Sequence, residues 1–141
     1  MKKITSVVLA LALAATFGLA VIADDTKTTT VSYEKTASYT WEVPSTVTAG
    51  GAAGTVSASN VIIAYGTQLK ISITDGVSDG KVTLTLKGQS ETVTAAVTYT
   101  ELTVSAGTTA GGSQTLTVAT PASVKYAGEY TGTITFTATV E

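Results

Sequence analysis

The chain of 141 residues contains no cysteine, no histidine and no arginine, so its eight basic side chains are all lysines. These absences remove the thiolate nucleophile, the imidazole base and the guanidinium clamp on which many catalytic sites depend. Carboxylate pairs remain available, but the acidic residues are scattered among polar turns and strand edges. We therefore expect a protein that is not an enzyme and that carries no cofactor and no metal.

The absence of cysteine also excludes disulfides, which small exported domains often use to offset a thin core. After residue 23 the chain carries six lysines against ten acidic residues, a net charge of 6 − 10 = −4. Nucleic acids and anionic membrane surfaces attract basic faces, so neither is an expected partner.

The first 23 residues have the order of a secretory signal peptide. Lys2 and Lys3 form a positive start, Val7–Ala15 is an unbroken apolar run, and Ala23 closes a segment suited to cleavage. A retained membrane anchor is the alternative, because the stretch from residue 4 onwards is almost long enough to span a bilayer. We favour cleavage after Ala23, and hence a secreted, extracellular or cell-surface protein with no stable membrane anchor.

Threonine is abundant, and its spacing is regular. Of the 141 − 23 = 118 residues after Ala23, 28 are threonine. From Tyr130 to Val140 every odd position is threonine, while the even positions hold residues that a core accepts. Side chains on a strand alternate between its two faces, so this pattern predicts one strand with a dry face and a wet face.

Similar alternation recurs along the chain, and no stretch beyond residue 23 shows helical periodicity. The expected strands are 30–35 with 38–43, 55–58, 61–65, 68–74, 81–87, 91–100, 102–105, 114–119 and 130–140. Seven to nine short, mainly antiparallel strands with turn residues between them are typical of an all-β sandwich. The expected organisation is a signal peptide at 1–23, a leader or first strand at 24–37 and a β-sandwich domain at 38–141.

Two stretches resemble parts of known secreted proteins. The run Tyr39-Thr40-Trp41-Glu42-Val43-Pro44 is similar to the opening of small secreted proteins of Gram-positive anaerobes. The run from Ala127 to Phe136 is similar to their closing strand, and spore-coat and fimbrial sandwich domains end in a comparable Ala-Gly-x-Tyr strand. This chain lacks the cysteines of those domains. The resemblance implies an immunoglobulin-like β-sandwich at the cell surface or in the extracellular matrix, with no catalytic residues to carry over.

Asp75-Gly76 and Asp79-Gly80 bracket a segment that superficially suggests a calcium loop. Such a loop needs oxygen ligands at alternate positions and a closing glutamate, whereas Val77 stands at the third position and no glutamate follows. Glycine takes positive φ freely and aspartate tolerates it, so both pairs are expected to form turns.

Aromatic side chains are candidates either for the core or for stacking on sugar rings. The candidate platforms are Trp41 with Tyr39, Tyr126 with Tyr130, and the single side chains Tyr65 and Tyr99. Trp41 shares a strand face with Tyr39 and Val43, which favours a place in the core. Tyr130 is expected to close one end of the sandwich with a hydrogen bond to the backbone. Ligand binding would then use exposed tyrosines such as Tyr65 or Tyr99.

The N-terminal leader is a candidate for pairing with a second copy of the chain. Thr29, Val31 and Tyr33 alternate on one face, and a strand of this kind can add to a neighbour's sheet or complete its own. We expect a non-enzymatic structural protein of the surface or extracellular matrix, which acts as a self-assembling or adhesive subunit. The alternative is a module that binds carbohydrate, such as a polysaccharide, or a host ligand.

Overall fold

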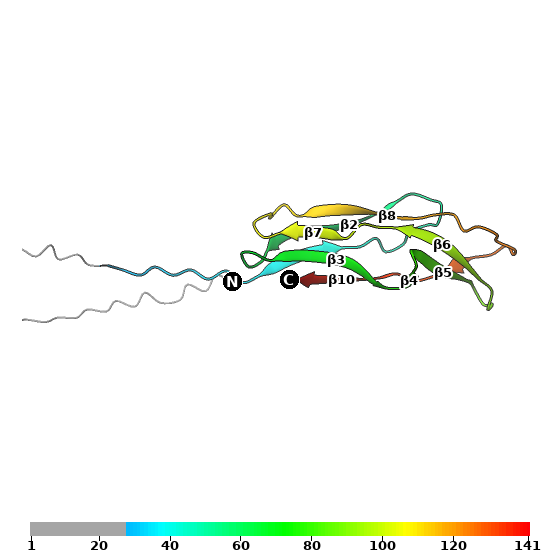
Figure 1. The fold of residues 1–141 in the computed structure, drawn as a ribbon, viewed down its shortest axis with the longest axis horizontal. Coiled ribbons are helices and arrows are strands. Elements are labelled where there is room, and N and C mark those ends of the chain that lie inside the picture. Colours follow the sequence, from blue (N-terminus) through cyan, green and yellow to red (C-terminus); the bar gives the residue numbers. More distant parts are fainter. Residues whose placement is uncertain (1–27) are drawn as a thin grey trace, which may run out of the picture. The chain divides into compact units, whose positions relative to one another are not determined.

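A computed structural model describes residues 28–141, and the expected signal peptide at 1–23 lies outside this range. The chain divides into one unit that ends at Lys35 and a compact unit, Thr36–Glu141. All of the described secondary structure lies in the compact unit and consists of strands (Figure 1). Within residues 28–141, no helix is long and apolar enough to cross a membrane.

Ten strands make up the compact unit. They are β1 (Ser38–Glu42), β2 (Gly54–Ile62), β3 (Gln68–Asp75), β4 (Val77–Ser78), β5 (Lys81–Leu86), β6 (Thr92–Thr98), β7 (Leu102–Ser105), β8 (Gly112–Val118), β9 (Tyr130–Thr131) and β10 (Thr135–Val140). Every pairing between them is antiparallel, so the prediction of an all-β, antiparallel chain is confirmed. Seven to nine strands are expected from the sequence, whereas residues 28–141 form ten. Two of these, β4 and β9, have only two residues each.

The strands form two sheets of unequal size. The larger has the order β1-β2-β8-β6-β5-β4, with β9 also paired to β5, and the smaller has the order β10-β3-β7. Figure 1 shows β3, β7 and β10 at one end of the compact unit and β4, β5 and β6 toward the other. The smaller sheet therefore faces only part of the larger one.

Two clusters of buried side chains reflect this difference in size. The first cluster joins both sheets and consists of Val56, Ala58, Val61, Leu69, Ile71, Leu102, Val104 and Leu116. The second cluster has three buried members, Val82, Ala95 and Val118, and all three come from the larger sheet. Full burial of a large aliphatic side chain contributes about 1.5–3 kcal/mol, so the first cluster carries most of the hydrophobic stabilisation.

A bulge in β2 merges two runs that the sequence predicts as separate strands. Between Thr40↔Ser59 and Ser38↔Ile62, β1 advances two residues while β2 advances three. Asn60 takes a positive φ of 52° at this point, a conformation that asparagine tolerates better than most residues. The extra residue shifts the alternation, so that Val61 faces the core with Val56 and Ala58.

The turn prediction is confirmed at Asp79-Gly80, whereas Gly76 forms a bend between the end of β3 and β4. Asp79 and Gly80, with φ of 49° and 69°, form a two-residue connection between Ser78 and Lys81, which pair across β4 and β5. At the other pair, Gly76 has a φ of 85° and donates its N–H to Asp75 Oδ1 at 2.8 Å.

The final strand differs from its prediction, because 130–140 forms two strands in different sheets. Strand β9 pairs with β5 in the larger sheet, and β10 pairs with β3 in the smaller one. Between them, Thr133 O lies 1.9 Å from the position of a Cβ on Gly76, and a Cβ on Gly132 would lie 2.5 Å from Thr83 O. The chain crosses between the sheets only because glycine stands at both contacts. The even residues are consequently not buried: Gly132 and Val140 are exposed, and the half-buried ones are Tyr130, Ile134, Phe136 and Ala138.

Candidate functional site

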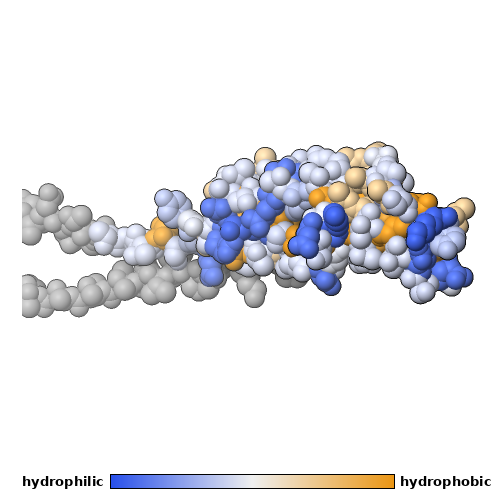
Figure 2. All heavy atoms as spheres, turned by 45° about the vertical axis from the view of Figure 1, so that its right-hand side comes forward, coloured by the Kyte–Doolittle hydropathy of each residue, from blue (hydrophilic) through white to orange (hydrophobic). Residues whose placement is uncertain are grey.

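A groove opens on the flank of the compact unit, over the second cluster. Its volume is about 530 Å³, and it lies between the segment Pro44–Ala49 and the segment that leads from Pro121 to Phe136. The apolar side chains in its lining are Val47, Val82, Leu84, Leu116, Val118, Val124, Ile134 and Phe136. Figure 2 shows apolar surface interrupting the polar face of this unit. We call this feature the groove.

The groove exists because the smaller sheet does not extend over β5 and the adjoining end of β8. Within the compact unit, the second cluster is completed by half-buried residues from loops and from the larger sheet, namely Val47, Ala49, Leu84, Val97 and Ile134. Valine, alanine, leucine and isoleucine side chains are usually buried inside proteins, whereas these five are partly in contact with solvent. The groove therefore leaves part of the second cluster uncovered. Its lining also contains the polar residues Ser45, Thr46, Thr48, Glu129 and Thr131.

The backbone of β10 adds an unpaired edge beside the groove. Among the described strands, β10 pairs with β3 and with no other. Phe136, near the start of β10, lines the groove, so this strand begins beside it. Unpaired N–H and C=O groups on an edge strand can accept a further strand.

The described part of the N-terminal leader, residues 28–35, is named the arm here. Each of its side chains is exposed, and the exposed fractions of Val31 and Tyr33 reach 88% and 85%. The arm forms no strand, in contrast to the expectation for 30–35. The reason is that Ser38 already pairs with Ile62, the last residue of β2, so β2 offers no further partner to the preceding residues.

The two tyrosines proposed as ligand contacts lie in different environments. Tyr65 is fully exposed on the connection between β2 and β3. Tyr99 is half-buried, donates its hydroxyl to Ile71 O at 2.7 Å and accepts the N–H of Leu102 at 3.3 Å. Its ring also packs edge-on against Phe136, with 5.2 Å between centroids. Burial raises the pKa of Tyr99 above 10.0.

The structure also gives the positions of Trp41 and Tyr130, the other aromatic residues considered above. Trp41 is half-buried and packs against the first cluster, whereas Tyr39 and Val43 are about 40% exposed because β1 is an edge strand. The Tyr130 hydroxyl donates to Tyr126 O at 3.2 Å, which is the expected bond to the backbone.

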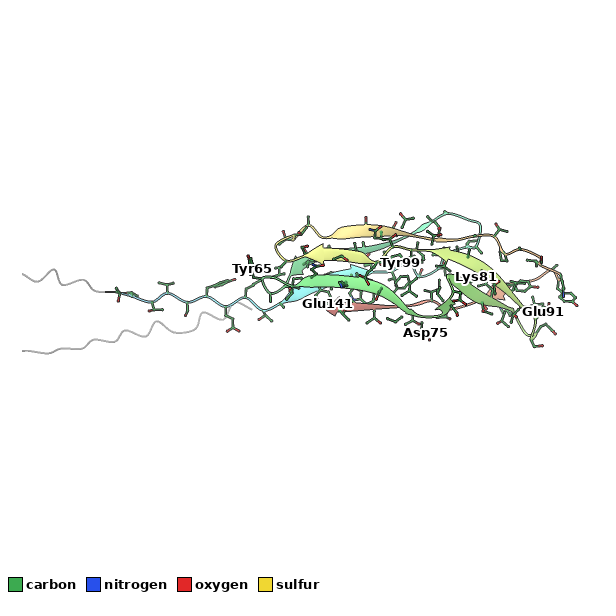
Figure 3. All side chains as sticks on the ribbon, in the orientation of Figure 1. Tyr65, Asp75, Lys81, Glu91, Tyr99 and Glu141 are labelled. Carbon is green, nitrogen blue, oxygen red and sulfur yellow. The ribbon has the colours of Figure 1, made fainter. Side chains whose placement is uncertain are left out.

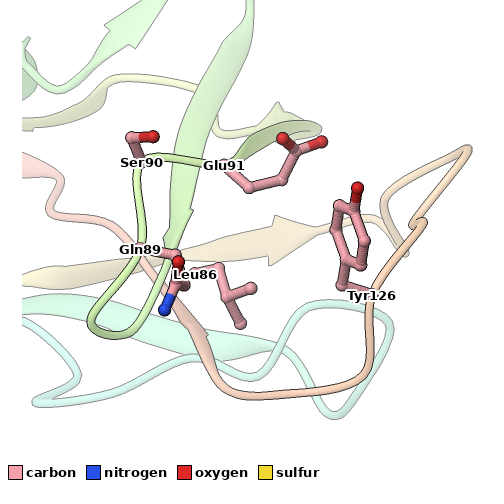
Figure 4. Close-up of a pocket in the computed structure, with 5 residues that line it drawn as sticks. All are labelled: Leu86, Gln89, Ser90, Glu91 and Tyr126. Atoms are coloured by element: carbon pink, nitrogen blue, oxygen red, sulfur yellow. The ribbon is translucent and has the colours of Figure 1, made fainter.

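A second hollow, named here the loop pocket, lies between the β5–β6 connection and Tyr126. Its volume is about 380 Å³, and its lining consists of Leu86, Gln89, Ser90, Glu91 and Tyr126. Figure 4 shows the Glu91 carboxylate next to the Tyr126 ring in this view, with Gln89 and Ser90 on the other side of Leu86. Figure 3 places Glu91 and Tyr65 at opposite ends of the compact unit.

Two ion pairs hold strand ends in the described chain. Lys87 Nζ donates to Glu129 Oε2 at 2.8 Å, and Lys70 pairs with the carboxylate of Glu141. The hydrogen bond and the charge of Glu141 raise the pKa of Lys70 above 10.5. Residues 28–141 contain no group of three or more acidic side chains placed to hold a metal ion.

Sequence patterns did not reveal the groove or the loop pocket. Both are formed by segments far apart in the chain, and neither has a local motif. The available sign of a binding surface was the presence of Val124 and Tyr126 in the loop after Pro121. Large apolar side chains in a loop are exposed unless a partner covers them, and both residues are exposed here. Comparisons with protein families, curated proteins and solved structures find no match for this chain.

Proposed function

We propose that the chain is a secreted, non-enzymatic structural subunit that assembles when the arm of one copy occupies the groove of another. The folded unit acts as an immunoglobulin-like sandwich with one position for a strand left open. The observation that carries the proposal is the groove, a partly apolar lining over the second cluster. The expected site of assembly is the cell surface or the extracellular matrix.

The arm has the pattern that the groove requires. In an extended chain, Thr29, Val31 and Tyr33 share one face, and Ser32 and Glu34 share the other. The first face presents a valine and a tyrosine to an apolar lining, while the second face stays in water.

Side-chain burial alone is a weak source of affinity here. Burying Val31 and Tyr33 contributes about 1.5–3 kcal/mol each, and part of this is offset by ordering the arm. Lasting assembly therefore needs backbone hydrogen bonds as well, which the free edge of β10 can supply. The outcome is addition of a strand, with alternate side chains directed into the groove.

Size-exclusion chromatography with light scattering tests the proposal on the chain from Asp24 to Glu141. The unaltered chain should form oligomers or fibres whose amount grows with concentration. Val31→Asp should leave monomers, because a charge enters the apolar lining. Ser32→Asp adds the same charge to the opposite face and should still assemble.

Two results would contradict the proposal. One is a monomer at every concentration, and the other is equal assembly by both aspartate variants. Circular dichroism of the monomers confirms that the compact unit remains folded.

A further inference from the structure

We infer that the loop pocket is a binding site for an uncharged or amine-bearing sugar ring of a polysaccharide. This inference concerns a different part of the surface from the assembly described above. It rests on the shape of the pocket, the chemistry of its walls and the bonds that hold those walls in place.

The walls combine the two kinds of group that a pyranose ring recognises. One side of a pyranose presents C–H groups with partial positive charge, and the negative face of an aromatic ring attracts them. Tyr126 supplies such a ring, 56% exposed, with Leu86 beside it. Gln89, Ser90 and Glu91 offer an amide, a hydroxyl and a carboxylate to sugar hydroxyls.

The pocket is held in shape before any ligand binds. Leu86 N donates to Glu91 O at 2.9 Å, and Gln89 N donates to Leu86 O at 3.0 Å, which closes the β5–β6 connection. The opposite wall is fixed by the bond from Tyr130 to the Tyr126 carbonyl. A rigid site loses less conformational entropy when it binds a ligand.

The two walls are also joined to each other. Lys87 N donates to Glu129 O at 2.9 Å, and the side chains of these residues form the ion pair. Leu86 pairs with Tyr130 across β5 and β9. The distance between Tyr126 and Glu91 is thereby set by the fold rather than by the ligand.

Charge selects the class of sugar. Lys87 is paired with Glu129, whereas Glu91 forms no ion pair among the described residues. A free carboxylate repels uronic acids and sulfated sugars, and it attracts an amino group. At about 380 Å³ the pocket has the size of a small-ligand site, at the lower end of the usual range of about 300–1,000 Å³.

Tyr126 has no evident structural task for its side chain. Its ring is more than half exposed, and its hydroxyl forms no hydrogen bond within residues 28–141. The backbone carbonyl of Tyr126 accepts the hydrogen bond from Tyr130, and an alanine at this position would keep that carbonyl.

Affinity electrophoresis tests the inference on the chain from Asp24 to Glu141 carrying Val31→Asp, so that assembly does not affect mobility. The gels contain a neutral β-glucan, chitosan or polygalacturonate as three separate probes. Retention is expected with the glucan or with chitosan. Tyr126→Ala should weaken it at least about tenfold in Kd, a difference of about 1.4 kcal/mol. Glu91→Gln should weaken the binding of chitosan more than that of the glucan.

Tyr65→Ala is the matched control, because it removes an exposed tyrosine at the opposite end of the compact unit and should leave retention unchanged. The inference is overturned by retention on polygalacturonate alone, by no retention on any probe, or by retention that survives Tyr126→Ala. All variants share the Val31→Asp background, so differences in retention among them do not depend on whether the chain polymerises.

Discussion

At the scale of single residues, Tyr99 shows how one side chain can link both sheets. This residue directly follows β6 of the larger sheet, and its contacts lie in the smaller sheet. Its hydroxyl bonds to backbone groups of β3 and β7, and its ring packs on Phe136 of β10. In the expected strand 91–100, alternation places Tyr99 on the same face as the buried Val93 and Ala95. The flanking threonines therefore do not mark this tyrosine as exposed, and the expectation of an exposed Tyr99 is wrong. A pattern of alternation assigns the face of a side chain, but it does not identify the groups on another sheet to which that side chain bonds.

Replacement of Tyr99 by phenylalanine should lower the free energy of unfolding by about 1–3 kcal/mol, because the carbonyl of Ile71 and the N–H of Leu102 lose their partner. Urea denaturation at pH 7 measures this loss. Tyr65→Phe is the control, since this side chain is fully exposed, and its effect should stay within about 0.5 kcal/mol. Equal effects of the two variants would show that the bonds of Tyr99 contribute nothing.

Stability should also fall as the pH rises above about 10. Burial raises the pKa of Tyr99 in the folded chain above 10.0, and pairing with Glu141 raises that of Lys70 above 10.5. Above these values the unfolded chain loses protons that the folded chain retains, which favours unfolding. Urea midpoints from pH 8 to pH 11 should therefore decline, and Tyr99→Phe should make the decline shallower. A flat profile would contradict the origin given for both shifts.

At the scale of elements, local pattern predicts strands well and their pairing poorly. Runs such as Leu102–Ser105 appear with the predicted bounds, because alternation and turn residues act locally. The split of 130–140 depends instead on Gly76, a residue more than fifty positions earlier that makes room for Thr133. The bulge at Asn60 is a similar case, since only its pairing with β1 reveals the extra residue.

Gly76→Ala tests whether the crossing of the final segment depends on this contact. A Cβ at Gly76 would lie 1.9 Å from Thr133 O, whereas a Cβ at Gly80 meets nothing within 4 Å. Both glycines have positive φ, so Gly80→Ala should cost only the backbone strain of about 1–2 kcal/mol. The clash should add about 1–3 kcal/mol at Gly76. Thermal and urea unfolding measure the difference, and equal losses would argue against close contact at the crossing.

At the scale of the whole molecule, composition and alternation are enough to predict an antiparallel all-β chain. They are not enough to predict the groove, because it results from two sheets that cover unequal areas. The lining combines Val82 of β5 with Val118 of β8 and Phe136 of β10, which lie far apart in the sequence. The alternation of Val31 and Tyr33 is visible in the sequence, whereas the surface proposed to bind these residues is visible only in the folded structure.

Cross-linking between copies tests the central proposal most directly, and the absence of native cysteine gives a clean background. Two variants of different mass are prepared, one carrying Val31→Cys and the other Val124→Cys. They are then mixed and oxidised gently. Val124 lines the groove and is 48% exposed, so a disulfide needs the arm of one copy within about 7 Å (Cα to Cα) of this position in another. Occupation of the groove predicts a mixed disulfide from Val31→Cys, and much less from Ser32→Cys. Assembly that continues without any such mixed disulfide would contradict the proposal.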